Sequence, residues 1–406
     1  MPTIKLNKKV FENLVGKKLP LEELKEKIAY LGTDLESIDE NEITVEIFPN
    51  RPDLLSEQGF ARAFSSFIGI KTGLKEYKVK KSSYRVKIDS SVIDIRPFTT
   101  CAIVKNLNLN DEKIKEIIQI QEKLHITYGR NRKKAAIGIY PFEKITTPIY
   151  YKALPKREIK FQPLESDKEM TAEQILQNHP TGKAYAHLLE NQEKYPVFID
   201  ANNKILSMPP IINSHETGKI TEETKEVFIE CSGFDFQTLK ICLNIIVTAL
   251  SDMGGEIYSM ELFYPKNKEI TPDLSPEKMK LDLNCTNKIL GLKLSEQEVK
   301  KYLERMGYDY KSKSVLIPSY RADILHPIDV IEDIAIAYGY ENFLPELPKI
   351  ATIAKENESA VSRRKIRESL IGLGLLEASS YLLISKEQLK KAKMKNSIEL
   401  LNPLNQ

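Results

Sequence analysis

Thirty-one consecutive residues near the amino terminus recur further along this chain, and this internal repeat constrains the fold more than any other feature. Residues 4–34 align without a gap to residues 279–309, at a constant offset of 275, with nine identical positions. Ordinary residue usage would give roughly two identities by chance. Each copy continues through a strand-like stretch into the motif Arg-x-Asp-aliphatic-Leu, at residues 51–55 and 321–325. The chain therefore contains two versions of one small backbone.

The second copy shows the secondary structure of the repeat most clearly. Ser295 and Glu298 form the S-x-x-E capping box that opens a helix. Apolar residues follow at i, i+3, i+4 and i+7, and Gly307 ends the helix where a left-handed residue is needed. Strands are predicted next, at residues 43–48 in the first copy and 314–318 in the second. Each repeat is thus predicted to be a small α+β unit.

The two copies differ chemically on the helix that follows the Arg-x-Asp motif. At three matched positions the first copy has Gly59, Arg62 and Ala63, and the second has Asp329, Glu332 and Asp333. On the predicted helix 326–338 these carboxylates fall within roughly a third of a turn, and Asp323 lies just before it. Such carboxylates repel one another, which a hard cation such as magnesium would offset. A solvated acidic face and a basic partner surface remain as alternatives.

Composition limits the remaining possibilities. At 406 residues the chain is too long for one core, so three or four domains are expected. The net charge of +3 means that any nucleic-acid surface is local. The amino terminus lacks the apolar core of a signal peptide, and the longest apolar stretch, 241–250, is too short to span a bilayer. The four cysteines form no CxxC pair and are interpreted as small buried residues in a reducing cytoplasm.

We expect a multidomain fold of the α+β class, with two related small domains on either side of a larger one. The predicted domains are a small α+β domain at 1–75, a larger α+β domain at 84–268, a second small α+β domain at 275–345, and a final segment at 355–406. In that segment a helix over 362–374 and a hairpin-like stretch over 376–384 are predicted. About fifty residues cannot build a deep core, so we expect the start of a domain whose remainder is missing or supplied by a partner.

The middle domain contains three informative stretches, at residues 195–200, 206–214 and 227–233. The paired prolines after Ser207 predict a rigid turn that can present hydroxyl and N–H groups to a small polar ligand. Glu230 and Ser232 lie on one side of a strand, by its period of two. The alternative is a proline corner and a strand end without a ligand. A basic cluster at 128–134 is interpreted as a solvated loop, with phosphate contact as the other possibility.

A set of short motifs follows in a specific order. They are NRPDLL at 50–55, QEKLH at 121–125, GRNRKK at 129–134, AIG at 136–138, LSMPPIIN at 206–213, YRADI at 320–324, IED at 331–333 and YGY at 338–340. In this order and spacing, the chain strongly resembles the β subunits of phenylalanyl-tRNA synthetases of the archaeal and eukaryotic cytoplasmic type. The resemblance covers nearly the whole chain.

The resemblance implies a cytoplasmic phenylalanine–tRNA ligase, with no membrane contact, that charges tRNA(Phe) using ATP. The chain would be the β subunit of an α2β2 heterotetramer, with the aminoacylation site on the α subunit and no catalytic residue for aminoacylation here. Region 84–268 would be a tRNA-editing domain that hydrolyses mischarged tyrosyl-tRNA(Phe). Region 355–406 would be the truncated start of a catalytically inactive class II synthetase-like domain. A free-standing tRNA-binding or trans-editing protein, or a non-catalytic scaffold, are the alternative functions.

Site residues carry over from the family by position. The resemblance assigns the editing pocket to Phe198, Ser207, Glu230 and Ser232. It assigns Mg²⁺, shared with the α subunit, to Asp323, Asp329, Glu332 and Asp333. Four of these depart from the usual family residue: Phe198 replaces Leu, Glu230 replaces Asp, Ser232 replaces Thr and Asp333 replaces Glu. The last three keep the functional group and change its reach.

Overall fold

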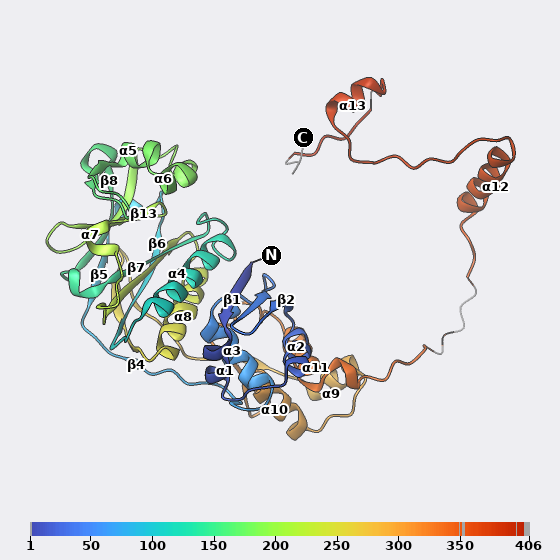
Figure 1. Ribbon diagram of the computed structural model, residues 1–406, viewed down its shortest axis with the longest axis horizontal. Coiled ribbons are helices and arrows are strands. Elements are labelled where there is room, and N and C mark those ends of the chain that lie inside the picture. The colour runs from blue at the N-terminus through green and yellow to red at the C-terminus, as the bar shows by residue number, and fades with distance from the viewer. Residues whose placement is uncertain (1, 349, 351–353, 395, 402–406) are drawn as a thin grey trace. The chain divides into compact units, whose positions relative to one another are not determined.

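The computed structural model describes residues 2–348, 350, 354–394 and 396–401. It divides into two compact units, residues 1–343 and 344–406. All five β-sheets of the described residues lie in the first unit, which is a mixed α/β structure (Figure 1).

The two repeats have the same order of strands and α-helices, and they differ in the place of a 3-10 helix. The first contains β1 (Thr3–Asn7), α1 (Lys8–Val15), α2 (Leu21–Tyr30), β2 (Asp34–Ile38), β3 (Glu42–Glu46), the 3-10 helix η1 (Pro52–Leu54) and α3 (Glu57–Phe67). The second contains β18 (Glu277–Lys280), α9 (Leu283–Leu290), α10 (Glu296–Arg305), β19 (Asp309–Lys311), β20 (Ser314–Ile317), α11 (Pro327–Tyr338) and η6 (Tyr340–Asn342). The strand orders, β1-β3-β2 and β18-β20-β19, correspond, so the predicted duplication is confirmed.

The predicted helix ends are also confirmed. Ser295 Oγ accepts from the Glu298 N–H at 3.3 Å, and Glu298 Oε2 accepts from the Ser295 N–H at 2.8 Å, which is the capping box. Gly307 follows α10 with a φ of 81°, a left-handed conformation that glycine adopts without steric cost. A tight turn at Ser312 and Lys313, both with positive φ, joins β19 to β20. The offset between copies accordingly falls from 275 to 270, the difference between Arg321 and Arg51.

The Arg-x-Asp motif forms the same ion pair in both repeats. Nε and Nη2 of Arg51 donate to the two carboxylate oxygens of Asp53, each at 2.9 Å. The same atoms of Arg321 donate to the oxygens of Asp323 at 2.8 and 2.7 Å. A guanidinium group matches a carboxylate through two parallel hydrogen bonds. The motif is therefore a structural feature of this backbone in both copies.

The middle region contains two large sheets and a small one. The five-stranded sheet has the order β4 (Val79–Lys80), β15 (Glu256–Tyr258), β6 (Phe98–Lys105), β14 (Val227–Gly233), β7 (Ala135–Pro141). The seven-stranded sheet has the order β13 (Ile212–Asn213), β12 (Ile205–Met208), β11 (Lys194–Ile199), β8 (Ile149–Pro155), β5 (Arg85–Ile88), β16 (Met260–Phe263), β17 (Lys268–Thr271). β9 (Lys160–Phe161) pairs with β10 (Met170–Thr171).

Helices cover the outer faces of these sheets. The helices of the region are α4 (Asp111–Ile126), α5 (Ala172–Asn178), α6 (Pro180–Tyr185), α7 (His215–Gly218) and α8 (Phe236–Asp252), with 3-10 helices η2 (Ser90–Val92), η3 (Phe142–Lys144), η4 (Lys156–Glu158) and η5 (Ala186–Leu188). Along β14, Ile229 and Cys231 share a core with α8, whereas Phe228 lies in a second core with Phe198 of β11. Since successive strand residues point to opposite faces, the two large sheets pack against each other through that second core.

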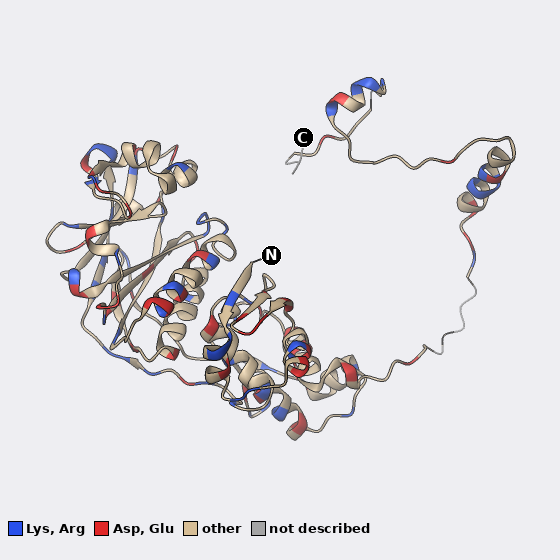
Figure 2. Cartoon of the chain, viewed as in Figure 1, with Lys and Arg blue, Asp and Glu red and all other residues tan. Residues whose placement is uncertain are grey.

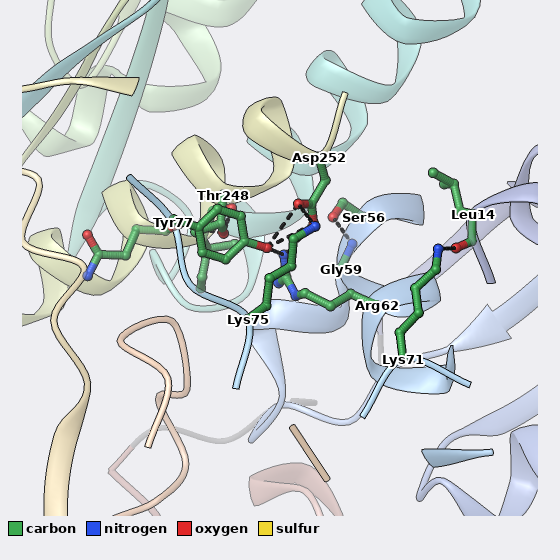
Figure 3. A network of polar contacts seen from close by, with 11 residues as sticks. Leu14, Ser56, Gly59, Arg62, Lys71, Lys75, Tyr77, Thr248 and Asp252 are labelled. Carbon is green, nitrogen blue, oxygen red and sulfur yellow. Dashed lines mark hydrogen bonds and ion pairs between the residues drawn. The ribbon is translucent and has the colours of Figure 1, made fainter. Parts of the chain in front are cut away.

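A buried network joins the repeats to the middle region (Figure 3). Arg62 Nη1, on α3, donates to Asp252 Oδ2 at 2.7 Å and to Tyr77 Oη at 2.8 Å. Lys75 Nζ donates to Asp252 Oδ1 at 2.7 Å. The Arg62 guanidinium group also lies 4.1 Å from the ring centroid of Tyr320, in the second repeat. Arg62 therefore links the first repeat, the end of α8 and the second repeat.

Two expectations from the sequence are wrong. The second unit contains α12 (Glu358–Gly372) and α13 (Lys386–Lys391), but no strand within 376–384, all of which the structure describes. Leu376 and Leu382 there are 94% and 97% exposed, so a hairpin has no surface on which to pack. Cys285 is exposed on α9, whereas Cys101, Cys231 and Cys242 are buried as expected.

Charge is spread over the chain. Figure 2 shows Lys and Arg interspersed with Asp and Glu along the elements, in agreement with the small net charge. No described helix combines the length and the apolar character that a membrane crossing requires.

Candidate functional site

The four residues predicted for the pocket meet between the two large sheets. Glu230 and Ser232 lie on β14 of the five-stranded sheet, and Phe198 and Ser207 lie on β11 and β12 of the seven-stranded sheet. Each is at most 2% exposed. Two surface hollows, of about 440 and 400 Å³, lie elsewhere and contain none of them. The structure therefore brings the four residues together in the buried layer between the two sheets.

Strand pairing sets their positions. Ser207 is the direct partner of Phe198 on β11 and of Asn213 on β13. Glu230 is the direct partner of Gly138 on β7. Directly opposed residues of an antiparallel pair point to the same face, so these side chains all face the space between the sheets.

The sequence did not single out Tyr140, which lies at the centre of this space. Its hydroxyl oxygen is 2.8 Å from Ser207 Oγ, 3.1 Å from Glu230 Oε1 and 3.3 Å from Asn213 Oδ1. Its ring stacks on Phe228 with centroids 5.6 Å apart. Tyr140 comes two residues after the AIG motif at 136–138, and that spacing on one strand was the available signal.

Arg96 is a second residue that the sequence analysis did not identify, and it binds Ser232. Arg96 Nε donates to Ser232 Oγ at 3.1 Å, and Nη2 donates to the Ser232 carbonyl oxygen at 2.5 Å. Arg96 is 3% exposed, and its own carbonyl accepts from the Tyr151 hydroxyl at 2.9 Å. Tyr151 in turn stacks on Phe198 at 4.4 Å between centroids. No motif marks Arg96, because its place depends on the packing of the two sheets.

Glu230 has an unusual protonation equilibrium. Burial raises the pKa of its carboxyl group to about 8, while the hydrogen bond from Tyr140 and the charge of Arg96 act in the opposite direction. Its second oxygen, Oε2, is buried without a hydrogen-bond partner among the described residues. The protonated form is therefore favoured at neutral pH. A neutral carboxyl group can donate one hydrogen bond and accept others, which suits it to a phenolic ligand.

Beside the pocket, the basic cluster at 128–134 forms a constrained loop. Arg130, Asn131 and Arg132 have φ values of 49°, 51° and 63°, a conformation that costs about 1–2 kcal/mol for each non-glycine residue. Arg132 Nη1 donates to the Ile211 carbonyl oxygen at 2.7 Å, next to the proline corner. The Arg132 carbonyl oxygen accepts from Arg96 Nη2 at 3.3 Å. The loop is therefore fixed against the pocket by Arg132.

The acidic residues of the second repeat divide between interior and surface. Asp333 is 5% exposed, and its Oδ2 accepts from Tyr308 Oη and, at 2.7 Å, from Arg321 Nη2. Asp323 is bound by the same arginine. Asp333 therefore does not belong to the exposed acidic face expected for this helix, because Arg321 provides an interior partner for its charge.

Asp329 and Glu332 remain on the outer side of α11. Asp329 Oδ2 accepts from the N–H groups of Leu325 and His326 at 2.8 and 2.7 Å, and Glu332 is exposed. Among the described residues, the one group of three acidic ligand atoms within 4.8 Å of one another is Asp34, Glu36 and Glu46, in the first repeat. No three of the four carboxylates predicted for magnesium, all of them described, have ligand atoms within that distance of one another.

Family profiles match most of the chain. A profile described as the tRNA synthetase B5 domain matches residues 279–340, and one described as the B3/4 domain matches residues 102–241. A third, described as the phenylalanyl-tRNA synthetase beta chain CLM domain, matches residues 345–406. The candidate pocket lies in the B3/4 match and the acidic residues lie in the B5 match.

Curated relatives align to the whole length of this chain. The phenylalanine–tRNA ligase beta subunit of Pyrococcus abyssi is 41% identical over 419 residues, an alignment that covers 100% of this chain and 75% of that protein. The beta subunit of Archaeoglobus fulgidus is 39% identical over 414 residues, with the same coverage. A crystal structure of an N-terminal fragment of the phenylalanyl-tRNA synthetase beta subunit from Pyrococcus horikoshii superposes with a TM-score of 0.80 and 40% identity, covering 84% of this chain and 100% of the fragment. The chain belongs to the family of phenylalanine–tRNA ligase beta subunits.

Proposed function

We propose that this chain works as the β subunit of a phenylalanine–tRNA ligase and that its middle region hydrolyses tyrosyl-tRNA(Phe). In that reaction water adds to the ester carbonyl carbon, the bond to the terminal ribose oxygen breaks, and tyrosine and uncharged tRNA are released. The observation that carries the proposal is the convergence of Ser207, Glu230 and Ser232 between the two sheets.

The pocket's chemistry suits the discrimination of tyrosine from phenylalanine. The two amino acids differ by one hydroxyl group, and Glu230 and Ser207 supply polar partners for such a group. A phenylalanyl ring would leave those buried groups unpaired, at about 1–3 kcal/mol for each. No residue near them is an obvious general base, so we expect hydrolysis to depend on the positioning of water and ester, with the tRNA itself contributing groups.

Contact with tRNA is supported by the loop at 129–134. Arg130 and Asn131 are exposed, three successive residues have positive φ, and Arg132 fixes the loop beside the pocket. We assign Arg130 and Lys133 to the phosphates of the tRNA acceptor end, because both are exposed on this loop.

An α subunit as partner is supported by the contrast between the repeats. The α3 face that carries Arg62 is covered by the middle region, through Asp252. The matched position on α11, 270 residues later, is the exposed Glu332. The same helix face is therefore covered by the middle region in the first repeat and exposed in the second. A basic partner surface would complement the exposed acidic face of the second repeat.

Aminoacylation with ATP is proposed for the α subunit of an α2β2 assembly. A magnesium ion shared between the subunits would be bound through Asp329 and Glu332, the carboxylates at the surface, with the remaining ligands coming from the partner. Asp323 and Asp333 would act indirectly, because both are bound by Arg321. A bound magnesium ion would supply charge neutralisation at this face.

The test uses the complex reconstituted with the α subunit. Glu230→Ala should abolish the hydrolysis of tyrosyl-tRNA(Phe) and leave phenylalanylation unchanged. Glu226→Ala is the matched control, because this carboxyl group lies just before β14 and pairs with Lys105 rather than facing the pocket. Hydrolysis at the parental rate in Glu230→Ala would place the editing site elsewhere. Failure to co-purify with an α subunit would favour a free-standing editing protein.

A further inference from the structure

The pocket already contains a phenol group, which the chain itself supplies. Tyr140 is 0% exposed, and its hydroxyl group lies within hydrogen-bond distance of Ser207, Glu230 and Asn213. Two of these are the groups proposed above to recognise a tyrosyl ligand. A residue of the chain therefore occupies the position that the proposed substrate requires.

With this phenol in place, Glu230 Oε1 and Ser207 Oγ have a hydrogen-bond partner, whereas Glu230 Oε2 has none among the described residues. The hydroxyl group has one proton and two lone pairs, whereas Asn213 Oδ1 only accepts. Tyr140 Oη lies within donor distance of all three groups, but its single proton can serve only one of them at a time. An ionised Glu230 would compete for the single phenolic proton, so the neutral carboxyl group is the form that satisfies this arrangement.

The apolar half of the pocket matches an aromatic ring as well. The Tyr140 ring stacks on Phe228, which lies 6.4 Å from Phe198 in an edge-to-face contact. The ring folds back over Gly138 on its own strand. A Cβ atom at residue 138 would lie 2.1 Å from Tyr140 Oη and 2.5 Å from Cζ. The space for the phenol exists because residue 138 has no side chain.

We propose that this space is a binding site for a p-hydroxyphenyl group and that Tyr140 fills it as an internal competitor of the ligand. A tyrosyl group enters only when the Tyr140 side chain leaves. β7 is an edge strand of its sheet and Tyr140 is its penultimate residue, so a local opening of β7 that releases the side chain breaks hydrogen bonds to β14 alone. The identity of the natural ligand rests on the proposed function, whereas the occupancy by Tyr140 does not.

The competition has a quantitative consequence. Apparent affinity for a ligand is reduced by the fraction of molecules in which the site is open. Removal of the Tyr140 hydroxyl group weakens the closed state, and removal of the whole ring abolishes it. The affinity for a p-hydroxyphenyl ligand should therefore increase in the order wild type, Tyr140→Phe, Tyr140→Ala.

The first experiment measures the binding of p-cresol to the full chain by titration calorimetry. We expect the order just given, and we expect Tyr140→Ala to bind toluene at least about tenfold more weakly than p-cresol, because toluene leaves buried polar groups unpaired. Tyr151→Phe is the matched control: it removes a second fully buried phenol hydroxyl of the same core, one that donates to Arg96 rather than to Ser207 or Glu230. It should bind p-cresol no better than wild type.

A flat or reversed order of p-cresol affinity would overturn the proposal, as would equal binding of toluene and p-cresol by Tyr140→Ala. If Tyr140→Ala does not fold, the comparison of Tyr140→Phe with wild type still decides. Hydrolysis of tyrosyl-tRNA(Phe) by the reconstituted complex separates this proposal from the proposed function. If the p-cresol order is observed and no variant hydrolyses tyrosyl-tRNA, the site stands and the editing function fails. If wild type hydrolyses tyrosyl-tRNA and Tyr140→Phe shows neither faster hydrolysis nor tighter p-cresol binding, the internal competition fails alone.

Discussion

Glu230→Gln tests most directly whether the closed pocket holds a proton. The Glu230 carboxyl group is 2% exposed, and burial raises its pKa from 4.5 to about 8 in the folded chain. In the unfolded chain the group titrates near its ordinary value. Between these two pH values the folded state binds one proton more than the unfolded state. The stability of the wild-type protein should therefore fall as the pH rises through this window.

The difference between the Glu230 pKa in the unfolded chain, 4.5, and in the folded chain, about 8, sets the size of the loss of stability. At about 1.4 kcal/mol per pH unit, it corresponds to at most about 5 kcal/mol. The loss of unfolding free energy caused by this ionisation is absent below about pH 4.5, grows as the pH rises, and is complete above about pH 8. Gln does not ionise, so the variant should lack this loss. The two proteins should have similar free energies of unfolding near pH 5, and the variant should be the more stable above pH 8.

The assay is hydrogen exchange of the β14 amides at a series of pH values, corrected for intrinsic exchange, because these amides become accessible when the sheet opens. Glu226→Gln, at the partly exposed carboxyl group that precedes β14, is the control and should keep the wild-type pH dependence. Parallel pH profiles for wild type and Glu230→Gln would show that Glu230 is ionised in the folded chain, and the proton inventory of the pocket would be refuted.

Three further outcomes follow from the packing. Arg62→Ala leaves Asp252 buried without its arginine partner, so the free energy of urea unfolding should fall by about 3–5 kcal/mol. Lys75→Ala removes a half-exposed partner of the same Asp and should lower that free energy by less than about 1 kcal/mol. Asp333→Asn should lower thermal stability by about 2 kcal/mol, because it takes a charged partner from Arg321, whereas Glu332→Gln should stay within about 0.5 kcal/mol. The opposite ranking would contradict the inward position of Asp333. Gly138→Ala should destabilise the wild-type chain much more than the Tyr140→Ala variant, and strictly additive effects in that double-mutant cycle would mean that the phenol does not lie over Gly138.

Much of the fold follows from local sequence signals. The repeat predicted two matching units, and the capping box and Gly307 predicted the limits of α10, because caps depend on residues close together in the chain. The hairpin predicted at 376–384 failed because alternation describes a strand only where a neighbouring strand and a packing surface are present.

The candidate pocket was less accessible from sequence, for a physical reason. Glu230 and Ser232 could be paired from the period of a strand, and Ser207 from the prolines that follow it. Tyr140 and Arg96 reach the same space from other strands and loops, and nothing local indicates which buried tyrosine or arginine will do so. The same limitation applies to Asp333, whose inward position depends on Arg321, twelve residues earlier and outside its helix.

The repeat shows how one backbone can serve two environments. In both copies the Arg-x-Asp pair precedes the third α-helix, and the inner face of that helix packs in a core. The outer face is free to vary. In the first copy it carries Arg62, whose charge is neutralised by Asp252 of the same chain in a buried network. In the second copy it carries the exposed Glu332, which needs no change in the backbone. A buried charge requires a partner, whereas an exposed one does not. The substitution of Arg by Glu at this position thus distinguishes a helix face used for packing within the chain from one available to another molecule, and it is the sequence difference that makes the second repeat the better candidate for subunit contact.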